Sequence, residues 1–448
     1  MVNLDPFFRA NRIAVIGASR TSGKVGNVIV KQLKDHKKVF PVNPNAKNIL
    51  GLKCYNTIDS LPSVDLAVIA TPAETVSDIL FQCRKKRISH VVIISAGFKE
   101  IGNIELEKEL QTALRKNKIT CIGPNCLGIL DTYNKLDMLF LPSERLRRPQ
   151  KGAISFISQS GAVGSAIIDL AAYEGYGISK FVSYGNAANV DETDLLDYFA
   201  RDKKTDIICL YVEGIKDGKR FLKVAKKCKK PIIAIKGGVS EFGSQAAASH
   251  TGSLAGDAKI YFGAFNQANM ITTSTLQDLF KFAKFFEKVH AKVKGDRVQI
   301  ITNGGGYGIL TADAVAKYSL QLAKPGREIT KLKTKLPRTA VLNNPIDLLG
   351  DATTERYQLA VNAAVQDKNN DAIILVALTQ TPLLDEKLVS VVQKAYKKSK
   401  KPIVLVTTGS EYALKLRKKF EDAGLPVFTF PDQAVRALAK FMIYCMKK

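Results

Sequence analysis

One histidine of the sequence lies where it could do covalent chemistry. His250 is flanked by small residues, since residues 247–256 contain only Ala, Ser, His, Thr, Leu and Gly, and with Gly243 these predict a flexible loop. A neutral imidazole becomes an effective nucleophile when a carboxylate orients its other ring nitrogen, and Glu213 is the candidate carboxylate. A lone histidine is more often structural, so this interpretation needs support from elsewhere in the chain. The other three histidines, in lysine-rich stretches or just before a strand, are interpreted as structural or solvated: His36, His90 and His290.

That support comes from an internal duplication. Residues 157–169 align without a gap with residues 301–313, where a predicted strand leads through small residues into a helix. We therefore expect residues 150–285 and 295–445 to be two copies of one flavodoxin-like unit. Three further pairs of segments follow in the same order: 206–210 with 371–375, 229–233 with 400–404, and 265–268 with 420–423.

The two copies differ at the residues that could do chemistry. The first copy contains about fifteen additional residues between Glu241 and Phe265, and His250 lies among them. Glu213, at the end of a predicted strand, aligns with Leu378 in the second copy. No Cys or second His lies at ligand spacing from His250, so a metal site is not expected. The asymmetry favours a functional site in the first copy.

A glycine-rich turn near the start of the chain is a second candidate site. The loop 17–26 runs from a strand ending in Gly into a helix opened by Gly, which directs backbone N–H groups and the helix dipole toward a phosphate. Its spacing departs from the dinucleotide fingerprint, and Asn43 and Asn45 stand where an NAD site needs a carboxylate for the ribose. These residues leave three interpretations open: a plain βα turn, an NAD site, or a site for another adenine–phosphate ligand.

Three further turns have a similar character. Residues 123–128 follow a predicted strand, at the end where ligands bind in open α/β sheets, although Gly-Pro-Asn also forms ordinary turns. Residues 158–164 and 303–308 each place small residues at a helix N-terminus, whose unpaired N–H groups suit phosphate. Because the duplication relates these two turns in a chain without a Walker motif, we expect their helices to share one phosphate.

The net charge of +26 is the outlying bulk property. Most lysines fall on predicted helix surfaces without interleaved aromatic residues, so we interpret them as solvated faces and expect no nucleic-acid binding. A share of them could serve phosphate-rich ligands. The seven cysteines have neither disulfide nor metal-ligand spacing, as is typical of the reducing cytoplasm. No apolar run is long enough for a bilayer and the first ten residues lack a signal-peptide pattern, so we expect a cytoplasmic protein without membrane contact.

The elements that must position these residues form an α/β protein. Short β-branched runs alternate with helix-length amphipathic segments throughout, which predicts parallel sheets. We expect a Rossmann-like domain over residues 1–135, a flavodoxin-like domain with the histidine segment over 145–288, and a second flavodoxin-like domain over 295–448. A linker is predicted at 141–149. The strands of the first domain are predicted at 12–17, 39–42, 66–70, 91–95 and 120–122, with its first helix at 26–34.

With these motifs in this order, the chain resembles the α-subunits of ADP-forming acetyl-CoA synthetases (acetate–CoA ligases), in the wider succinyl-CoA synthetase superfamily. The shared motifs extend over almost the full length, and the segment 249–256 around His250 is the most specific of them. The others are residues 17–19, 42–45, 69–72, 95–98, 123–126, 158–161, 211–214, 303–306 and 344–348.

The resemblance implies a reversible ping-pong reaction in which acetyl-CoA, ADP and phosphate give acetate, CoA and ATP. In this reaction His250 attacks an acyl phosphate and becomes phosphohistidine, while Glu213 holds its imidazole. Asn125 and Cys126 are implied near the thioester and the acyl group. The residues implied in CoA binding are Gly17, Ala18, Ser19, Ser22, Asn43, Pro44, Thr71, Pro72, Ser95 and Gly97, and those implied in phosphate binding are Ser158, Ser160, Gly161, Gly304, Gly305 and Gly306.

The resemblance also implies a partner subunit, because the chain offers no nucleotide-binding module with magnesium-binding carboxylates. An ATP-grasp β-subunit would hold ADP or ATP and Mg, in an α2β2 heterotetramer. Two alternatives stay open: a non-catalytic CoA-binding or regulatory protein on the same scaffold, and a ligase for another acid such as succinate, an aryl acid or a branched acid. Asn43 and Asn45 disfavour an NAD-linked oxidoreductase.

Overall fold

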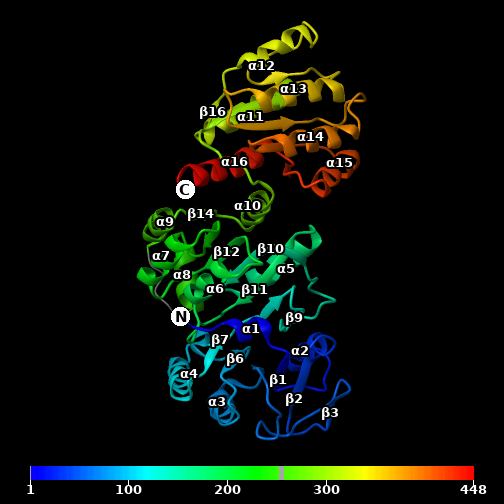
Figure 1. Ribbon diagram of the computed structural model, residues 1–448. Coiled ribbons are helices and arrows are strands. Elements are labelled where there is room, and N and C mark those ends of the chain that lie inside the picture. Colours follow the sequence, from blue (N-terminus) through cyan, green and yellow to red (C-terminus); the bar gives the residue numbers. More distant parts are fainter. Residues whose placement is uncertain (1, 252–256) are drawn as a thin grey trace. The chain divides into compact units, whose positions relative to one another are not determined.

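The computed structural model describes the backbone of residues 2–251 and 257–448, and their side chains except those of residues 248–251. Its elements fall into two compact units, residues 1–280 and 281–448. The first unit contains two parallel-stranded sheets and the second contains one (Figure 1). No helix in the described part of the chain has both the length and the apolar character needed to cross a membrane.

The first domain is a five-stranded parallel sheet with helices on both faces. Its strands are β1 (Arg12–Ile16), β2 (Lys38–Val42), β5 (Leu66–Ile69), β6 (His90–Ile93) and β7 (Thr120–Ile122), with a small hairpin of β3 (Asn48–Ile49) and β4 (Leu52–Lys53). Its helices are α1 (Asp5–Arg9), α2 (Val25–Leu33), α3 (Val76–Lys85) and α4 (Ile104–Asn117), with the 3-10 turns η1 (Ala73–Thr75) and η2 (Lys99–Ile101). The strand order is β2-β1-β5-β6-β7, so the predicted strands are confirmed.

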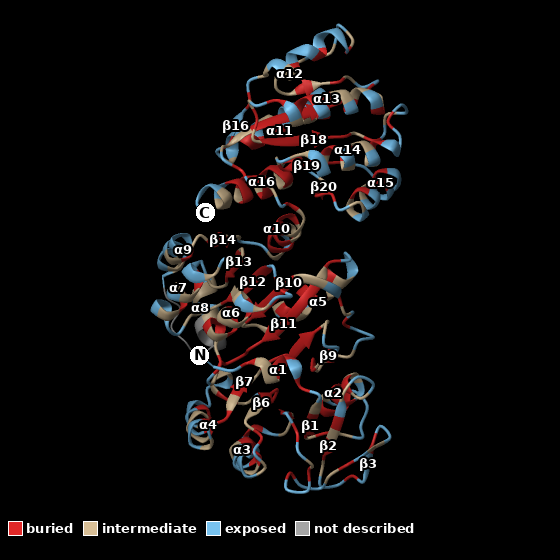
Figure 2. Ribbon diagram, viewed as in Figure 1, coloured by how far each residue is buried: buried red, intermediate tan, exposed pale blue. Residues whose placement is uncertain are grey.

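Alternation along the strands explains how this sheet buries both faces. Ile13 and Val15 of β1 belong to one apolar cluster with α2, while Ala14 and Ile16 belong to another with α3 and α4. Successive side chains of a strand point to opposite faces, so a strand that is apolar at every position must be covered on both sides. Figure 2 shows the buried strands between helices whose outer faces are exposed.

The second domain is built on a seven-stranded sheet. Its parallel strands are β10 (Gln150–Ser158), β11 (Gly177–Ser183), β12 (Ile207–Val212), β13 (Ile232–Lys236) and β14 (Ile271–Thr272), and β8 (Ile129–Asp131) and β9 (Leu136–Asp137) add an antiparallel edge. The helices are α5 (Gly161–Tyr173), α6 (Glu192–Arg201), α7 (Gly218–Lys227), α8 (Glu241–Thr251), α9 (Ala258–Gln267) and α10 (Leu276–Lys288). The order is β14-β13-β12-β10-β11-β8-β9.

The boundary between these two domains differs from the predicted one. We placed the end of the first domain at residue 135, but β8 pairs with β11 of the second sheet, and β9 pairs with β8. The second sheet therefore begins at Ile129. Strands of two or three residues satisfy either sheet equally well in sequence pattern, so their pairing is decided by the tertiary structure. The predicted linker at 141–149 contains no helix or strand.

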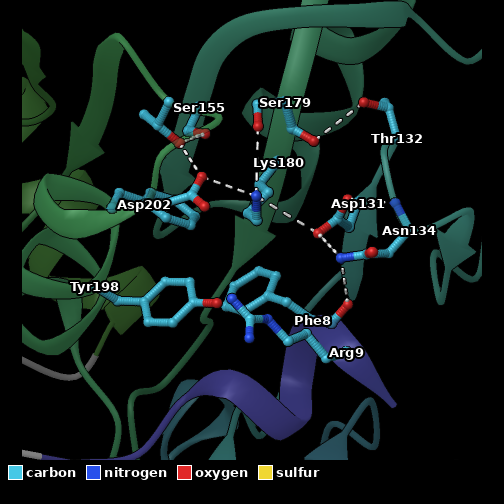
Figure 3. Close-up of polar contacts among 12 residues, drawn as sticks. Phe8, Arg9, Asp131, Thr132, Asn134, Ser155, Ser179, Lys180, Tyr198 and Asp202 are labelled. Carbon is cyan, nitrogen blue, oxygen red and sulfur yellow. Dashed lines mark hydrogen bonds and ion pairs between the residues drawn. The ribbon is translucent and has the colours of Figure 1, made fainter. Parts of the chain in front are cut away.

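Buried polar contacts fix the second sheet to the N-terminal segment (Figure 3). Lys180 of β11 donates to Asp202 at 2.8 Å and lies 3.6 Å from the carboxylate of Asp131 in β8. Asn134, which follows β8, donates to the backbone oxygen of Phe8 in α1 at 3.1 Å. The Phe8 ring stacks on that of Tyr198 in α6 at 4.7 Å between centroids. These contacts, with one apolar cluster shared by both sheets, hold the two domains together.

The second unit repeats the strand order of the second domain. Its strands are β15 (Arg297–Thr302), β16 (Gln321–Leu322), β17 (Ile346–Asp347), β18 (Ala372–Val376), β19 (Ile403–Val406) and β20 (Val427–Phe428). Its helices are α11 (Gly305–Lys317), α12 (Arg327–Thr330), α13 (Thr354–Gln366), α14 (Lys387–Lys398), α15 (Glu411–Asp422) and α16 (Pro431–Met446), with the 3-10 turn η3 (Lys331–Thr334). The order β16-β15-β18-β19-β20 matches β11-β10-β12-β13-β14 strand for strand, as expected of two flavodoxin-like copies.

Candidate active site

In each of the two large sheets of the first unit, the order of the parallel strands changes direction at one strand, β1 in the first sheet and β10 in the second. β1 lies between β2 and β5, and β10 lies between β11 and β12. Such a switch point opens a crevice at the carboxyl ends of the strands, where ligands bind in open α/β sheets. A cavity of about 720 Å³ joins residues that follow both switch points. Six predicted site residues line it: Thr71, Ser95, Asn125, Cys126, Ser160 and Gly161.

The loop after β1 packs tightly against the end of β5, the neighbouring strand in the sheet. Gly17 has φ +87°, and a Cβ there would lie 2.5 Å from the Ala70 oxygen, while one on Gly26 would lie 2.2 Å from the Gly17 oxygen. Asn43 donates to the Ala18 oxygen at 2.7 Å. These glycines bring the loop backbone against the start of α2, the geometry that suits a phosphate. The amide of Asn43 is thus used to hold the loop, while Ser19 and Pro44 lie at or near the surface.

Hydrogen bonds hold the turns after β5 and β6 together. Ser95 donates its hydroxyl proton to the backbone oxygen of Thr71 at 2.5 Å, and the Thr71 hydroxyl accepts from that of Thr75 at 2.9 Å. Gly97, with φ +115°, donates its N–H to Glu100 at 2.6 Å. The predicted CoA-binding residues of these turns therefore lie at one edge of the first sheet, next to the cavity.

Asn125 and Cys126 form the floor between the two domains. The Gly123–Pro124 bond is cis, Asn125 has φ +55°, and its N–H donates to the Ser95 oxygen at 2.8 Å. The thiol of Cys126 is buried and donates to the Ile93 oxygen at 3.3 Å. Burial raises the pKa of Cys126 to about 12, so the sulfur is a protonated part of the wall and no nucleophile.

Asn186 joins the floor formed by Asn125 and Cys126 to acidic residues of the first domain. Its amide nitrogen donates to Glu100 at 2.6 Å and to Glu107 at 3.2 Å, and its amide oxygen accepts from Asn125 at 3.4 Å. Its backbone oxygen accepts from Lys99 at 3.0 Å. The side chain is buried, so these contacts determine where the Asn125 amide lies.

The turn after β10 supplies a helix N-terminus to the same cavity. Ser160 caps α5, accepting from the N–H of Val163 at 3.3 Å, and Gly161 begins the helix. Ser158 is buried and donates its hydroxyl proton to the Ser160 oxygen at 2.6 Å. Ser160 and Gly161 thus line the cavity, and their contact with phosphate stays a prediction, whereas the hydroxyl of Ser158 supports the turn.

The equivalent turn of the second unit follows β15. Gly304 caps α11, and its N–H donates to the hydroxyl of Thr302 at 3.0 Å. The carboxylate of Asp347 lies 3.2 Å from where a Cβ of Gly305 would be, so a negative group already faces this helix start. The sharing of one phosphate by Gly161 and by Gly304, Gly305 and Gly306 stays a prediction.

Glu213 lies at the carboxyl end of β12 and is half-buried beside the turn that follows β10. Tyr211 donates to its carboxylate at 3.2 Å, and its backbone N–H donates to Gln159 at 2.7 Å. Burial, and then the carboxylate of Glu213, raise the pKa of Tyr211. Burial lowers the pKa of Lys236 in β13, and the negative charge of Glu213 opposes this shift. Glu213 is therefore the acceptor in a polar cluster at the strand ends.

His250 lies near the end of α8, and its side chain is outside the described residues. We expected this segment to be a flexible loop. The structure corrects that expectation, because residues 241–251 are helical. Ser240 accepts from the N–H of Gly243 at 3.1 Å and so opens the helix, and the alanines that follow are the strongest helix formers. Next to the strand end, Gly238 faces Ala247 of α8, since a Cβ added at Gly238 would lie 3.0 Å from that methyl group.

The helix that carries His250 lies beside the first domain. α8 is a neighbour of η2, the turn that contains Glu100 of the Asn186 network. Its other neighbour, Gly238, comes directly after Gly237, where a Cβ would lie 3.3 Å from the Cγ of Glu213. Helix α8 thus lies beside η2 of the first domain and beside Gly238, which follows the strand end near Glu213.

Known protein families match all three parts of the chain. Residues 11–132 match the CoA binding domain, residues 151–286 match the succinyl-CoA ligase like flavodoxin domain, and residues 298–440 match the Ligase-CoA domain. The α subunit of acetate–CoA ligase (ADP-forming) II from Pyrococcus furiosus is 39% identical over 97% of this chain and 96% of its own length. The chain belongs to the ADP-forming acetate–CoA ligase family.

Two further members differ in how much of their own length this chain covers. An acetate–CoA ligase (ADP-forming) from Methanocaldococcus jannaschii is 42% identical over 97% of this chain, which spans 62% of that longer protein. The structure of a Candidatus Korarchaeum cryptofilum acetyl-coenzyme A synthetase in complex with phosphate and ADP is 34% identical, with a TM-score of 0.91 over 99% of this chain and 98% of that one. The chain therefore corresponds to the α subunits, and the predicted family and fold class are confirmed.

Two polar residues of this family member's site were missed in sequence. Gln159 lines the cavity and binds the backbone of Glu213, and Asn186 holds Asn125. A signal for Gln159 was present, because the duplication aligns it with Asn303, also an amide. Asn186 carries no comparable signal, since its partners are more than sixty residues away in the first domain.

Proposed function

We propose that the chain is the phosphohistidine-carrying α subunit of an ADP-forming acyl-CoA synthetase that acts on acetyl-CoA. The observation that carries the proposal is the cavity between a CoA-binding type of sheet and a helix N-terminus. Thr71 and Ser95 line it from one side, Asn125 from its floor, and Ser160 and Gly161 from the other side. A thioester and a phosphate can meet there. The cytoplasm is the proposed compartment, because the seven cysteines lack disulfide spacing, as is typical of a reducing environment.

The first step is attack of inorganic phosphate on the thioester. A phosphate oxygen forms a bond to the acyl carbon, the carbon–sulfur bond breaks, and CoA leaves as a thiol after taking up a proton. The start of α5 stabilises the phosphate, since a helix N-terminus has about half a positive charge. Asn125, with its position fixed by Asn186, donates toward the acyl oxygen.

The second step transfers the phosphoryl group to His250. A ring nitrogen of the neutral imidazole attacks phosphorus, the bond to the acyl oxygen breaks, and acetate leaves. Glu213 accepts a hydrogen bond from the other ring nitrogen, which keeps the attacking nitrogen unprotonated and stabilises the positive charge as it forms. Helix α8, next to Glu213 and η2, delivers the histidine.

The third step needs a partner subunit. We propose an ATP-grasp β subunit that binds ADP and Mg and takes the phosphoryl group from His250, in an α2β2 assembly. This chain matches separate α subunits over almost their whole length, and it spans 62% of the longer M. jannaschii relative.

The test is the formation of phosphohistidine. The full chain with its partner is incubated with acetyl-CoA and ³²P-labelled phosphate without ADP, and we expect a phosphoprotein that is labile in acid and stable in base. His250→Ala must abolish the label. The proposal fails if the label persists in that variant, or if the wild-type complex is never labelled.

Glu213→Gln separates the role of the carboxylate from that of the histidine. The amide keeps the shape of the side chain and removes its charge, so labelling should slow by roughly 100-fold, while CoA should bind as before because the CoA-binding turns belong to the first domain. Labelling at the wild-type rate would remove Glu213 from the mechanism.

A further inference from the structure

Gln159 lies in the wall of the cavity with its amide oxygen fully engaged. The oxygen accepts from the backbone N–H of Glu213 at 2.7 Å, from that of Gly214 at 3.2 Å, and from the hydroxyl of Tyr184 at 3.3 Å. Two of these donors are backbone N–H groups, which can only donate. The oxygen of the amide must therefore face the end of β12, and its orientation is fixed by the backbone.

This orientation leaves the amide nitrogen for the cavity. In a planar amide the NH₂ group points away from the oxygen, and Gln159 is half-buried in the cavity wall between Ser158 and Ser160. Among the described residues, its nitrogen has no protein acceptor within hydrogen-bond distance. Two N–H donors thus face a space that also receives the start of α5.

In the second copy the equivalent amide oxygen accepts the same kind of backbone hydrogen bond, but the amide nitrogen is used differently. Asn303, the counterpart of Gln159, accepts from the N–H of Leu378 at 2.9 Å, as Gln159 accepts from Glu213. Its amide nitrogen, however, donates to the Leu378 oxygen at 3.1 Å and to the Thr381 hydroxyl at 3.3 Å. The anchoring bond is therefore a shared feature of the unit. The amide nitrogen without a protein acceptor among the described residues is that of Gln159, in the copy that carries the cavity.

We propose that the amide nitrogen of Gln159 donates to a phosphoryl oxygen of the substrate in this cavity, as phosphate and then as acyl phosphate. The inference rests on the proposed function for the identity of the reaction. The phosphorus must lie between the start of α5 and the residue that Glu213 orients. Gln159 lines the cavity with Ser160 and Gly161, and it binds the backbone of Glu213. The same side chain thereby fixes the Glu213 backbone relative to the phosphoryl group.

Two substitutions separate this role from structural support. Gln159→Glu keeps an oxygen for the three donors at the end of β12, but it replaces the NH₂ group with an oxygen that repels phosphate. Gln159→Met keeps the length and removes both functions. A structural role alone predicts that Gln159→Glu behaves like the wild type and only Gln159→Met is impaired. Phosphate contact predicts that both are impaired, and Gln159→Glu more strongly.

The measurement uses the complete complex of the chain and its partner. We expect Gln159→Glu to raise the KM for phosphate at least roughly tenfold and to lower kcat by roughly 100-fold, the range found when a transition-state donor is lost. The KM for acetyl-CoA and the melting temperature should stay close to the wild-type values. Gln111→Glu, the same change on α4 outside the cavity, should leave all four quantities unchanged.

A binding measurement keeps the inference testable apart from turnover. Calorimetric titration with inorganic phosphate should give at least a roughly tenfold weaker Kd for Gln159→Glu than for the wild type and Gln111→Glu. Equal affinities for phosphate in all three proteins would overturn the role of Gln159. Absence of phosphohistidine in the wild type, together with weaker binding in Gln159→Glu, would instead overturn the proposed function and leave the phosphate contact in place.

Discussion

At the scale of single residues, Glu192 is a buried carboxyl group that lacks a full set of hydrogen-bond partners. It is 1% exposed, and one of its oxygens has no hydrogen-bond partner among the described residues. Burial, and then the neighbouring Asp191, raise its pKa from 4.5 to about 7, although Lys216 and Arg220 oppose the shift. The folded protein therefore holds a proton on Glu192 over a pH range in which the unfolded chain has lost it.

This shift predicts a pH-dependent gain from Glu192→Gln. Because the folded pKa is the higher one, the wild type loses stability as pH rises from about 4.5 to about 7, and the loss is complete above that range. The variant lacks this titration. The stability of the variant relative to the wild type should therefore rise by about 3 kcal/mol between pH 5 and pH 8. Melting temperatures of both proteins at the two pH values measure this change. A relative stability that is the same at both pH values would contradict the account, and Glu109→Gln on the exposed face of α4 serves as control.

The sequence was more informative about the residues predicted to do chemistry than about those that hold them. His250, Glu213 and Asn125 belong to motifs that depend on local order, and an internal copy without the histidine and glutamate made the first two stand out. Asn186 acts through partners on other elements, and Gln159 through the end of a neighbouring strand. Which amide lies opposite which N–H is set by strand order, and no local pattern in a chain specifies it.

At the scale of elements, β11 is fixed to its surroundings by a buried ion cluster. The side chain of Lys180 is 4% exposed, that of Asp131 is 0% exposed and that of Asp202 is 12% exposed. Removing one member of a buried cluster leaves uncompensated charge, which typically costs about 3–5 kcal/mol. Lys180→Met should therefore destabilise the protein by about 4 kcal/mol in a denaturant titration.

A surface ion pair provides the matched comparison. Arg201 and Asp197 of α6 form a pair whose side chains are 56% and 31% exposed, and Arg201→Met should cost less than about 1 kcal/mol because water screens such pairs. Equal losses from Lys180→Met and Arg201→Met would mean that the buried cluster of Figure 3 does not hold the edge of the sheet.

The loop after β1 gives a second prediction for an element. Gly26 has no room for a methyl group, since a Cβ would lie 2.2 Å from the Gly17 oxygen, whereas Gly23 has open space and φ +81°. Gly26→Ala must push α2 away from the loop and should weaken CoA binding at least roughly tenfold, while Gly23→Ala incurs only a backbone strain of about 1–2 kcal/mol. CoA affinities measured by calorimetry test this. Equal effects of the two substitutions would exclude close packing of loop and helix as the cause.

Elements with a strong hydrophobic period were predictable, and short or ambiguous ones were not. Every predicted strand of the first sheet exists, because a buried parallel strand is a continuous apolar run. The predicted boundary at residue 135 left β8 in the first domain and β9 in neither domain, although β8 pairs with β11 and β9 with β8, because two or three residues carry no information about their pairing. The segment 241–251 was expected to be a loop because of its glycines and hydroxyls, but its alanines make a helix.

At the scale of the whole molecule, our proposal assigns the first two of its three steps to this chain and the third to a partner. It contains the cavity in which acetyl phosphate would form and the helix from which His250 would accept the phosphoryl group. It should become phosphorylated from acetyl-CoA and phosphate, and it should make ATP only with the partner. The net charge of +26 gives an acidic partner surface or anionic substrates a long-range attraction that weakens with salt.

The central claim is that His250 carries the phosphoryl group from acyl phosphate to the nucleotide. The most direct measurement is a chase: the complex is labelled with ³²P-phosphate and acetyl-CoA, freed of substrates, and mixed with ADP and Mg in a quenched-flow instrument. We predict that label leaves His250, located by peptide mapping, at the rate at which labelled ATP appears, and that the amounts match. Labelled ATP formed while the label on His250 stays constant would contradict the account.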